Sequence, residues 1–121
     1  MNTELILKNA LNVLNEKKAR ELKAVKVDEL TALTDYFIFA TATSNTHVRS
    51  LADEVDFKLS EIGFPPKHIE GKATGWLLLD FDTVIVHVFT AENREFYALD
   101  QMWADGEKLD LTTILDNSLE D

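Results

Sequence analysis

The segment from residue 75 to residue 89 constrains the fold of this chain more than any other stretch. It contains two apolar runs, 76–79 and 84–89, separated by the residues Asp-Phe-Asp-Thr. β-Branched and aromatic residues on both sides of turn-forming residues predict a tight β-hairpin. Folding it about Phe81 and Asp82 is expected to set Leu79 opposite Val84, and Trp76 opposite His87.

The two faces of this hairpin differ in composition. Side chains alternate between faces along a strand, and one face is wholly apolar, so it is predicted to be core. This face holds Leu77, Leu79, Val84, Val86 and Val88. The other face mixes large apolar groups with a carboxylate, a hydroxyl and an imidazole, which is typical of a surface that meets another molecule. Its members are Trp76, Leu78, Asp80, Thr83, Ile85, His87 and Phe89.

Length and charge limit the possible functions. A chain of 121 residues predicts one domain that buries roughly two-thirds of its unfolded surface. The net charge of −10 disfavours sequence-independent nucleic-acid binding, which relies on Lys and Arg, and favours a basic protein partner. The absence of cysteine excludes disulfides and thiolate sites. The first residues show no signal or membrane-spanning pattern, so we expect a cytoplasmic protein without membrane contact.

The rest of the chain alternates between helical and strand patterns. Helices are expected over 3–18, from the cap candidates 43–45 to Gly63, and over 91–103. Strands are expected over 22–27, 35–42 and 67–70; the second is apolar on both faces, so it belongs in the middle of a sheet. We predict a single α/β domain over 1–104 with a mixed five-stranded sheet and flanking helices. Residues 105–121 are interpreted as an acidic, frayed tail, with docking of 109–115 as the alternative.

One candidate metal site lies in the hairpin turn. Asp80 and Asp82 have the spacing with which nucleotidyltransferases hold Mg²⁺. Those enzymes also present a Gly-Ser pair to the triphosphate, and no glycine in this chain precedes a serine. The two aspartates are explained more simply as turn residues. A metal-dependent nucleotidyltransferase is kept as an alternative function, but we expect no cofactor and no metal.

The other polar motifs lack a complete catalytic set. His47, His68 and His87 do not have the spacing of zinc ligands, and Ser44 is not in a Gly-x-Ser-x-Gly elbow. Residues 43–46 enter a helix, where phosphate can bind, but without glycine ordinary capping is favoured. We therefore expect no enzyme. His87 shares a face with Trp76 and Asp80 and is interpreted as part of a recognition surface.

Several short motifs follow one another along the chain and carry a resemblance. They are DYF at 35–37, TSNTHVR at 43–49, LADEV at 51–55, EG at 70–71, GWLLLD at 75–80, VIVHVF at 84–89 and REFYAL at 94–99, followed by Trp103. Several co-linear motifs are far harder to meet by chance than one. Over about four-fifths of its length, the chain resembles the ribosomal silencing factor family, also called Iojap-like.

The resemblance implies a fold similar to nucleotidyltransferases but without their catalytic groups. It implies binding to the large ribosomal subunit through ribosomal protein fourteen, where the small subunit would otherwise make contact. Such binding blocks subunit joining and lowers translation under nutrient limitation or in stationary phase. Two positions depart from the family pattern. Asp82-Thr83 replaces Gly-Asp, which removes the freedom of glycine at positive φ, and Thr46 stands where an arginine often precedes the histidine.

The expected partner-binding residues come from the hairpin and the helix after it. Trp76 is expected to contribute most to affinity, since large amphipathic aromatics concentrate binding energy, and Asp80 to pair with a basic residue of the partner. The expected set is Trp76, Leu78, Asp80, His87, Phe89, Arg94 and Tyr97. Two other interpretations stay open. The final helix covers this face as a second core layer, or the face is buried in a homodimer of the free protein.

Overall fold

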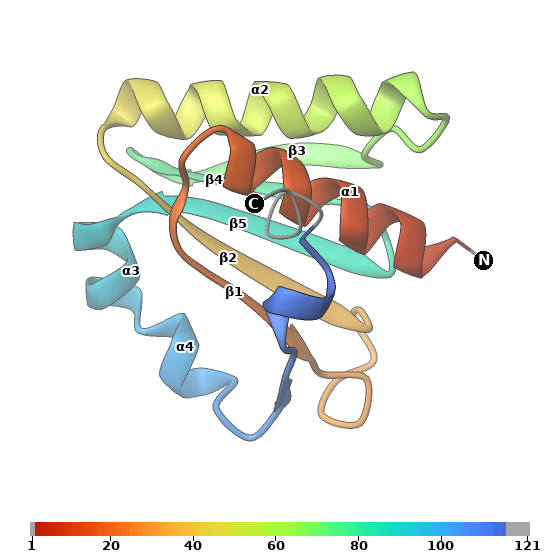
Figure 1. Ribbon diagram of the computed structural model, residues 1–121. Helices are drawn as coiled ribbons and strands as arrows, with labels where there is room; N and C mark the ends of the chain where they lie inside the picture. The colour runs from red at the N-terminus through yellow and green to blue at the C-terminus, as the bar shows by residue number, and fades with distance from the viewer. Residues whose placement is uncertain (1, 116–121) are drawn as a thin grey trace.

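A six-stranded mixed sheet runs through the molecule, with helices on both of its faces (Figure 1). The structure is a computed structural model and describes residues 2–115. The strand order is β3-β4-β5-β2-β1-β6, and only the central pair, β2 and β5, is parallel. The strands are β1 (Arg20–Lys26), β2 (Tyr36–Ala42), β3 (His68–Ala73), β4 (Trp76–Asp80), β5 (Val84–Thr90) and β6 (Glu107–Lys108).

Within residues 2–115, four α-helices and one short 3₁₀ helix complete the fold. They are α1 (Thr3–Glu16), α2 (Asn45–Glu61), α3 (Ala91–Tyr97), α4 (Leu99–Met102) and η1 (Leu111–Thr113). Helices α1 and α2 cover one face of the sheet, and α3 and α4 lie toward the other (Figure 1). The predicted α/β domain with a mixed sheet and flanking helices is confirmed, but the sheet has six strands instead of five.

The core under α1 and α2 follows from the sequence pattern. The apolar stripes of both helices face the apolar side of the hairpin, and α2 begins where Ser44 Oγ accepts the backbone N–H of His47 at 3.1 Å. Strand β2 is almost wholly buried because it lies in the middle of the sheet. The side chains that reach full burial here include Leu11, Leu14, Ile38, Leu51, Leu59, Leu79 and Val84. This is the main hydrophobic core.

The hairpin forms, but its register differs by two residues from the expected one. Trp76 pairs with Phe89 instead of His87, and Leu79 pairs with Val86 instead of Val84. The strand β4 continues through Asp80, so the turn is longer than the sequence pattern indicated. Because the shift is an even number of residues, each side chain keeps its predicted face.

The turn itself is built by the two aspartates. Asp82 takes φ 77°, in the left-handed region that favours glycine, and Asp80 Oδ1 accepts the backbone N–H of Asp82 at 2.7 Å. Asp82 also lies 3.5 Å from Lys67 Nζ. The prediction of a turn residue is confirmed for Asp82, whereas Asp80 is the last residue of β4 and caps the turn with its side chain. This chain reaches without glycine the positive φ that glycine adopts most easily.

The segment after α4 docks on the domain, at least as far as Leu115. Strand β6 pairs with β1, and the backbone N–H of Leu109 donates to Ala24 O at 2.9 Å. Four apolar side chains then pack against the main core: Leu109, Leu111, Ile114 and Leu115. The preferred interpretation of a frayed tail is therefore wrong for 107–115, because these apolar groups outweigh the acidic composition. Its remaining part, 116–121, lies outside the described residues.

Leu51 and Phe57 make a matched pair for testing the main core, since both lie on α2. Leu51 is fully buried, whereas Phe57 is 65% exposed. Leu51→Ala should lower the free energy of unfolding by about 2–5 kcal/mol, and Phe57→Ala should change it by less than about 0.5 kcal/mol. Urea unfolding followed by circular dichroism measures both. Equal effects of the two variants would contradict the packing of α2 described here.

Candidate functional site

The hairpin face expected to be exposed is largely covered. Trp76 is 8% exposed, His87 5% and Phe89 0%, so the expectation of an open surface is wrong for these three residues. They form a second core layer with side chains of the segment that follows β5. The residues of this layer are Val25, Val27, Phe37, Phe39, Trp76, Ile85 and Phe89, with Leu78, Leu99 and Trp103 packed against it.

Aromatic contacts hold α3 and the residues after α4 against this second core layer. The ring of Tyr97, the last residue of α3, lies 4.7 Å from the ring of Trp76. Beyond α4, the ring of Trp103 lies 4.8 Å from that of Phe37. Aromatic pairs at such distances contribute about 0.5–1.5 kcal/mol beyond the burial of their area. The interpretation that the last helical segment covers this face is therefore correct.

A hydrogen bond joins Trp76 and His87 in this layer. Trp76 Nε1 donates to His87 Nδ1 at 3.1 Å, which requires the neutral imidazole to carry its proton on Nε2. Burial of His87, with a smaller contribution from the charge of Lys72, lowers its pKa to about 4. The ring is thus neutral at physiological pH. The indole N–H of Trp76 therefore points into the protein.

A close approach of three elements places Trp76 at the start of β4. Gly75 has φ 81°, and a Cβ at this position would lie 2.6 Å from Asn45 Oδ1 and 3.0 Å from Asn93 Nδ2. Asn93 Nδ2 donates to Thr74 O at 2.7 Å, and the backbone N–H of Thr90 donates to Gly75 O at 3.0 Å. The turn before Trp76 is thereby fastened to the beginning of α3.

Leu78 and Asp80 are the two predicted site residues of the hairpin that keep solvent contact. Both are partly buried, and the edge strand β3 lies beside them. Glu70 pairs with Leu78, and His68 pairs with Asp80, so all four side chains share one face. We call these four residues the β3–β4 strip.

Side-chain contacts with His68 and Lys72 order the carboxylates of the β3–β4 strip. His68 Nε2 lies 2.7 Å from Glu70 Oε2 and 3.6 Å from Asp80 Oδ2. A hydrogen bond from Lys72, at 3.0 Å, is the main cause that lowers the pKa of Glu70. Sequence analysis did not select His68 or Glu70 as site residues. Only the pairing register of β3 with β4 brings them next to Leu78 and Asp80.

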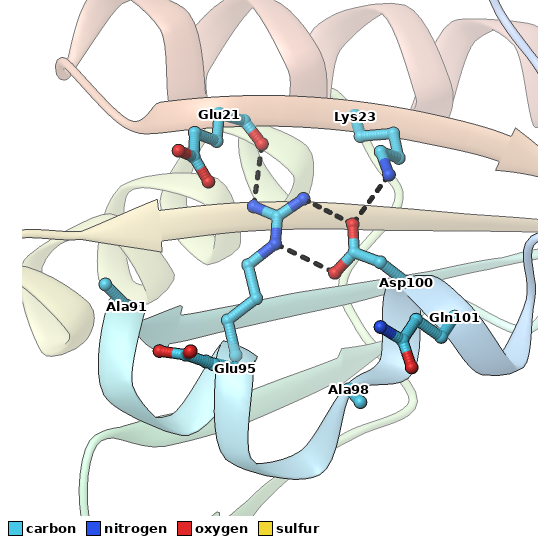
Figure 2. Close-up of a pocket in the computed structure, with 8 residues that line it drawn as sticks. Glu21, Lys23, Ala91, Glu95, Ala98, Asp100 and Gln101 are labelled. Atoms are coloured by element: carbon cyan, nitrogen blue, oxygen red, sulfur yellow. Dashed lines mark hydrogen bonds and ion pairs between the residues drawn. The ribbon is translucent and has the colours of Figure 1, made fainter.

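Arg94 is buried, contrary to the expectation of a partner contact. It is 8% exposed, and its Nε and Nη2 donate to the two carboxylate oxygens of Asp100 at 2.9 and 2.8 Å. Nη1 donates to Glu21 O at 2.7 Å and to Thr41 Oγ1 at 2.8 Å. In Figure 2, Lys23 reaches the same carboxylate, at 2.7 Å. Arg94 therefore ties α3 and α4 to β1 and β2.

The backbone bends sharply on both sides of this ion-pair network. Ala98, between α3 and α4, has φ 52°, and Glu21 has φ 47°; both lie in the left-handed region, which costs a non-glycine residue free energy. The bend at Ala98 turns the chain so that Asp100 meets Arg94. The bend at Glu21 accompanies the register shift in β1.

A cavity of about 630 Å³, lined mostly by charged residues, lies beside the Arg94 network (Figure 2). Both of its lining cations, Lys23 and Arg94, contact the carboxylate of Asp100. The hydrogen bond from Arg94 is the main cause that lowers the pKa of Asp100 to about 2. The Asp100 carboxylate thus stays charged at physiological pH, and its contacts with both cations give the cavity a structural role.

The remaining candidate motifs have structural roles in the described residues. His47 Nδ1 accepts the backbone N–H of Thr43 at 3.0 Å, and its Nε2 lies 3.0 Å from Lys17 O, so His47 joins α2 to the end of α1. Among residues 2–115, no group of three or more His, Asp or Glu side chains is arranged to hold a metal ion. In the same range, none of the helices has the length and apolarity needed to cross a bilayer.

Titration of His87 predicts a pH-dependent stability. The unfolded chain binds a proton at the ordinary pKa of 6.5, while the folded chain binds it only near pH 4. The stabilisation from neutral His87 is therefore complete above pH 6.5 and is lost as the pH falls toward 4. Wild type should lose roughly 3 kcal/mol more than His87→Gln between pH 7 and pH 4. Urea unfolding at several pH values measures this difference, and parallel curves for the two proteins would refute it.

Removal of Arg94 should destabilise the domain strongly. Arg94→Ala leaves Asp100 without its bidentate partner and frees α3 from β1, so the free energy of unfolding should fall by about 3–5 kcal/mol. Arg49, which is exposed on α2, supplies the control, since Arg49→Ala should change stability by less than about 0.5 kcal/mol. Thermal and urea unfolding compare the two. An Arg94→Ala protein as stable as wild type would show that the Arg94–Asp100 ion pair does not hold α3 and α4 on the sheet.

Comparisons with known proteins place the chain in a family. The family model described as "Ribosomal silencing factor during starvation" matches residues 1–120. The chain is 32% identical over 112 residues to "Ribosomal silencing factor RsfS" of Bacillus subtilis, covering 92% of this chain and 95% of that protein.

Relatives also occur among eukaryotic proteins and solved structures. The chain is 29% identical over 97 residues to mouse "Mitochondrial assembly of ribosomal large subunit protein 1", covering 77% of this chain and 42% of that protein. A crystal structure of a protein from Chromobacterium violaceum superposes with a TM-score of 0.81 at 32% identity, covering 86% of this chain and 88% of that one. The protein belongs to the ribosomal silencing factor family.

Proposed function

We propose that this protein binds the large ribosomal subunit through ribosomal protein fourteen and thereby prevents the small subunit from joining. The observation that carries the proposal is membership of the ribosomal silencing factor family over almost the whole chain. The mouse relative, whose name refers to assembly of the ribosomal large subunit, supports a partner on that subunit. The action is repression of translation under nutrient limitation or in stationary phase, without catalysis, and in the cytoplasm.

The partner surface that fits this proposal is the β3–β4 strip together with Tyr97. Leu78 offers a partly exposed apolar group, and Asp80 and Glu70 offer carboxylates on either side of it. Tyr97 is 40% exposed and extends the strip toward α3. A basic ribosomal protein complements such a surface, since opposite charges steer association and set the register of the contact.

The buried members of the expected site support this surface from below. Trp76 carries Tyr97 on its ring, and His87 pairs with Leu78 across the hairpin. Phe89 lies opposite Trp76, and Arg94 fixes α3. We therefore assign direct contact to Leu78, Asp80 and Tyr97, and a positioning role to Trp76, His87, Phe89 and Arg94.

Inhibition in this proposal is steric. Rigid elements hold a binding surface more precisely than loops do, and the strip lies on two paired strands, of which β4 contributes Trp76 and Leu78 to the second core layer. The rest of the domain then occupies the space that the small subunit needs. No chemical step and no ligand is required.

Sedimentation with purified ribosomal subunits tests the proposal. Wild-type protein should pellet with large subunits and reduce the fraction of joined ribosomes when small subunits are added. Leu78→Ala should raise the Kd for large subunits about tenfold, which corresponds to about 1.4 kcal/mol. Leu30→Ala removes a leucine that is 46% exposed in the loop after β1 and should leave the Kd unchanged. Normal joining of subunits at saturating wild-type protein would sink the proposal.

A further inference from the structure

A cavity of about 390 Å³ lies between the first turns of α2 and the turn that joins β3 to β4. Its volume falls within the range of small-molecule sites, roughly 300–1,000 Å³, whose walls are mostly apolar with a few polar groups that orient the ligand. The cavity has this composition. Its apolar wall consists of Val48, Ala73, Trp76 and Leu77, and polar groups come from Asn45 and Thr74.

Arg49 brings a positive charge to the lining of this cavity, and no carboxylate lies there with it. Four other cavities of the domain each have at least one Asp or Glu in their lining. Within residues 2–115, the guanidinium group of Arg49 has neither an ion pair nor a hydrogen bond. A guanidinium group in this state can bind a phosphate or a carboxylate through two parallel N–H donors.

Packing of the turn against α2 and α3 keeps the cavity formed in the absence of a ligand. Gly75 approaches α2 so closely that a Cβ there would lie 2.6 Å from Asn45 Oδ1. On the α2 side, Val48 is buried in the main core. On the α3 side, Asn93 Nδ2 fastens the turn by donating to Thr74 O at 2.7 Å. A preformed site avoids much of the ordering cost that binding otherwise carries.

We propose that this cavity binds a small organic anion, whose phosphate or carboxylate group meets Arg49 and whose apolar part lies against Val48 and Leu77. The site is separate from the β3–β4 strip, because Leu77 packs against the main core under α2, whereas Leu78 packs against the second core layer. Binding of the anion requires no ribosomal contact, so it stands apart from the proposed function.

The acidic side chains of α2 favour a small anion over a strand of nucleic acid. Asp53 and Asp56 follow Arg49 within about two turns of this helix. A row of phosphates that passed Arg49 would be repelled by these carboxylates, while binding of nucleic acid depends on several Lys and Arg side chains. A ligand of the size of the cavity places its charge at Arg49 alone.

Four probes separate the charged part of the ligand from its apolar part. Phenyl phosphate and benzoate carry both parts, inorganic phosphate carries the charge alone, and phenol carries the ring alone. In ¹⁵N NMR titrations, phenyl phosphate or benzoate should shift the amide signals of residues 45–49 and 73–77 with a Kd of about 1 mM, as for other ligands of this size. The tighter of the two identifies the anionic group. Inorganic phosphate and phenol should each bind at least about tenfold more weakly.

Arg49 and Arg20 supply a matched pair of variants. Both are exposed, and Arg20, at the start of β1, does not line this cavity. Arg49→Ala should raise the Kd for the tighter probe at least about tenfold, and Arg49→Lys about threefold, because lysine keeps the charge but lacks the planar fork. Arg20→Ala should bind within about twofold of wild type. All three variants should keep the wild-type melting temperature, which separates binding from folding.

Three results would each overturn the inference. The first is the absence of saturable shifts at these amides with both phenyl phosphate and benzoate. The second is an equal loss of binding in Arg49→Ala and Arg20→Ala, which would show a general effect of net charge. The third is tighter binding of a single-stranded RNA oligonucleotide than of either probe at the same amides, lost in Arg49→Ala, which would assign the cavity to nucleic acid.

Discussion

The ion pair between Arg94 and Asp100 is the contact on which the second half of the structure depends. It is shielded from solvent on the Arg94 side, it is bidentate, and Lys23 binds the same carboxylate. Because α4 has no buried residue of its own, apolar burial alone holds it weakly. The network fastens this short helix, and with it Trp103, over the aromatic layer. A buried charge that is well paired is costly to break, so the cover is firm.

Because α3, α4 and Trp103 cover it, the hairpin face that carries Trp76 is part of the protein interior. Trp76, His87 and Phe89 are internal groups, and the indole N–H of Trp76 is bound to His87 Nδ1 inside the protein. What the hairpin presents to solvent is its outer half, where β4 meets the edge strand β3. The hairpin is therefore buried on both of its faces, and the proposed binding surface lies along its outer edge. Burial of the hairpin on both faces explains how its narrow exposed edge, where β4 pairs with β3, is held rigid.

The sequence pattern predicted which side chains share a face, because alternation along a strand does not depend on the surroundings. It did not predict that the second face is covered. That outcome depends on the left-handed backbone at Ala98, a residue type that gives no signal of such a turn. Strand β6, with two residues, is too short to produce a pattern. The place of Glu70 and His68 in the strip follows from strand register, which local sequence does not specify.

Burial also decides which residues can report on binding. Truncation of a buried tryptophan costs about 3–5 kcal/mol, a large part of the roughly 5–15 kcal/mol that stabilises a domain of ordinary stability. Loss of ribosome binding after substitution of Trp76 would therefore follow from partial unfolding as readily as from a lost contact. Side chains such as Leu78, Tyr97 and Phe96 keep solvent contact in the folded protein. Phe96 packs in neither core, so its substitution leaves both in place, whereas Leu78 and Tyr97 also contact the second core layer and need a parallel measurement of stability.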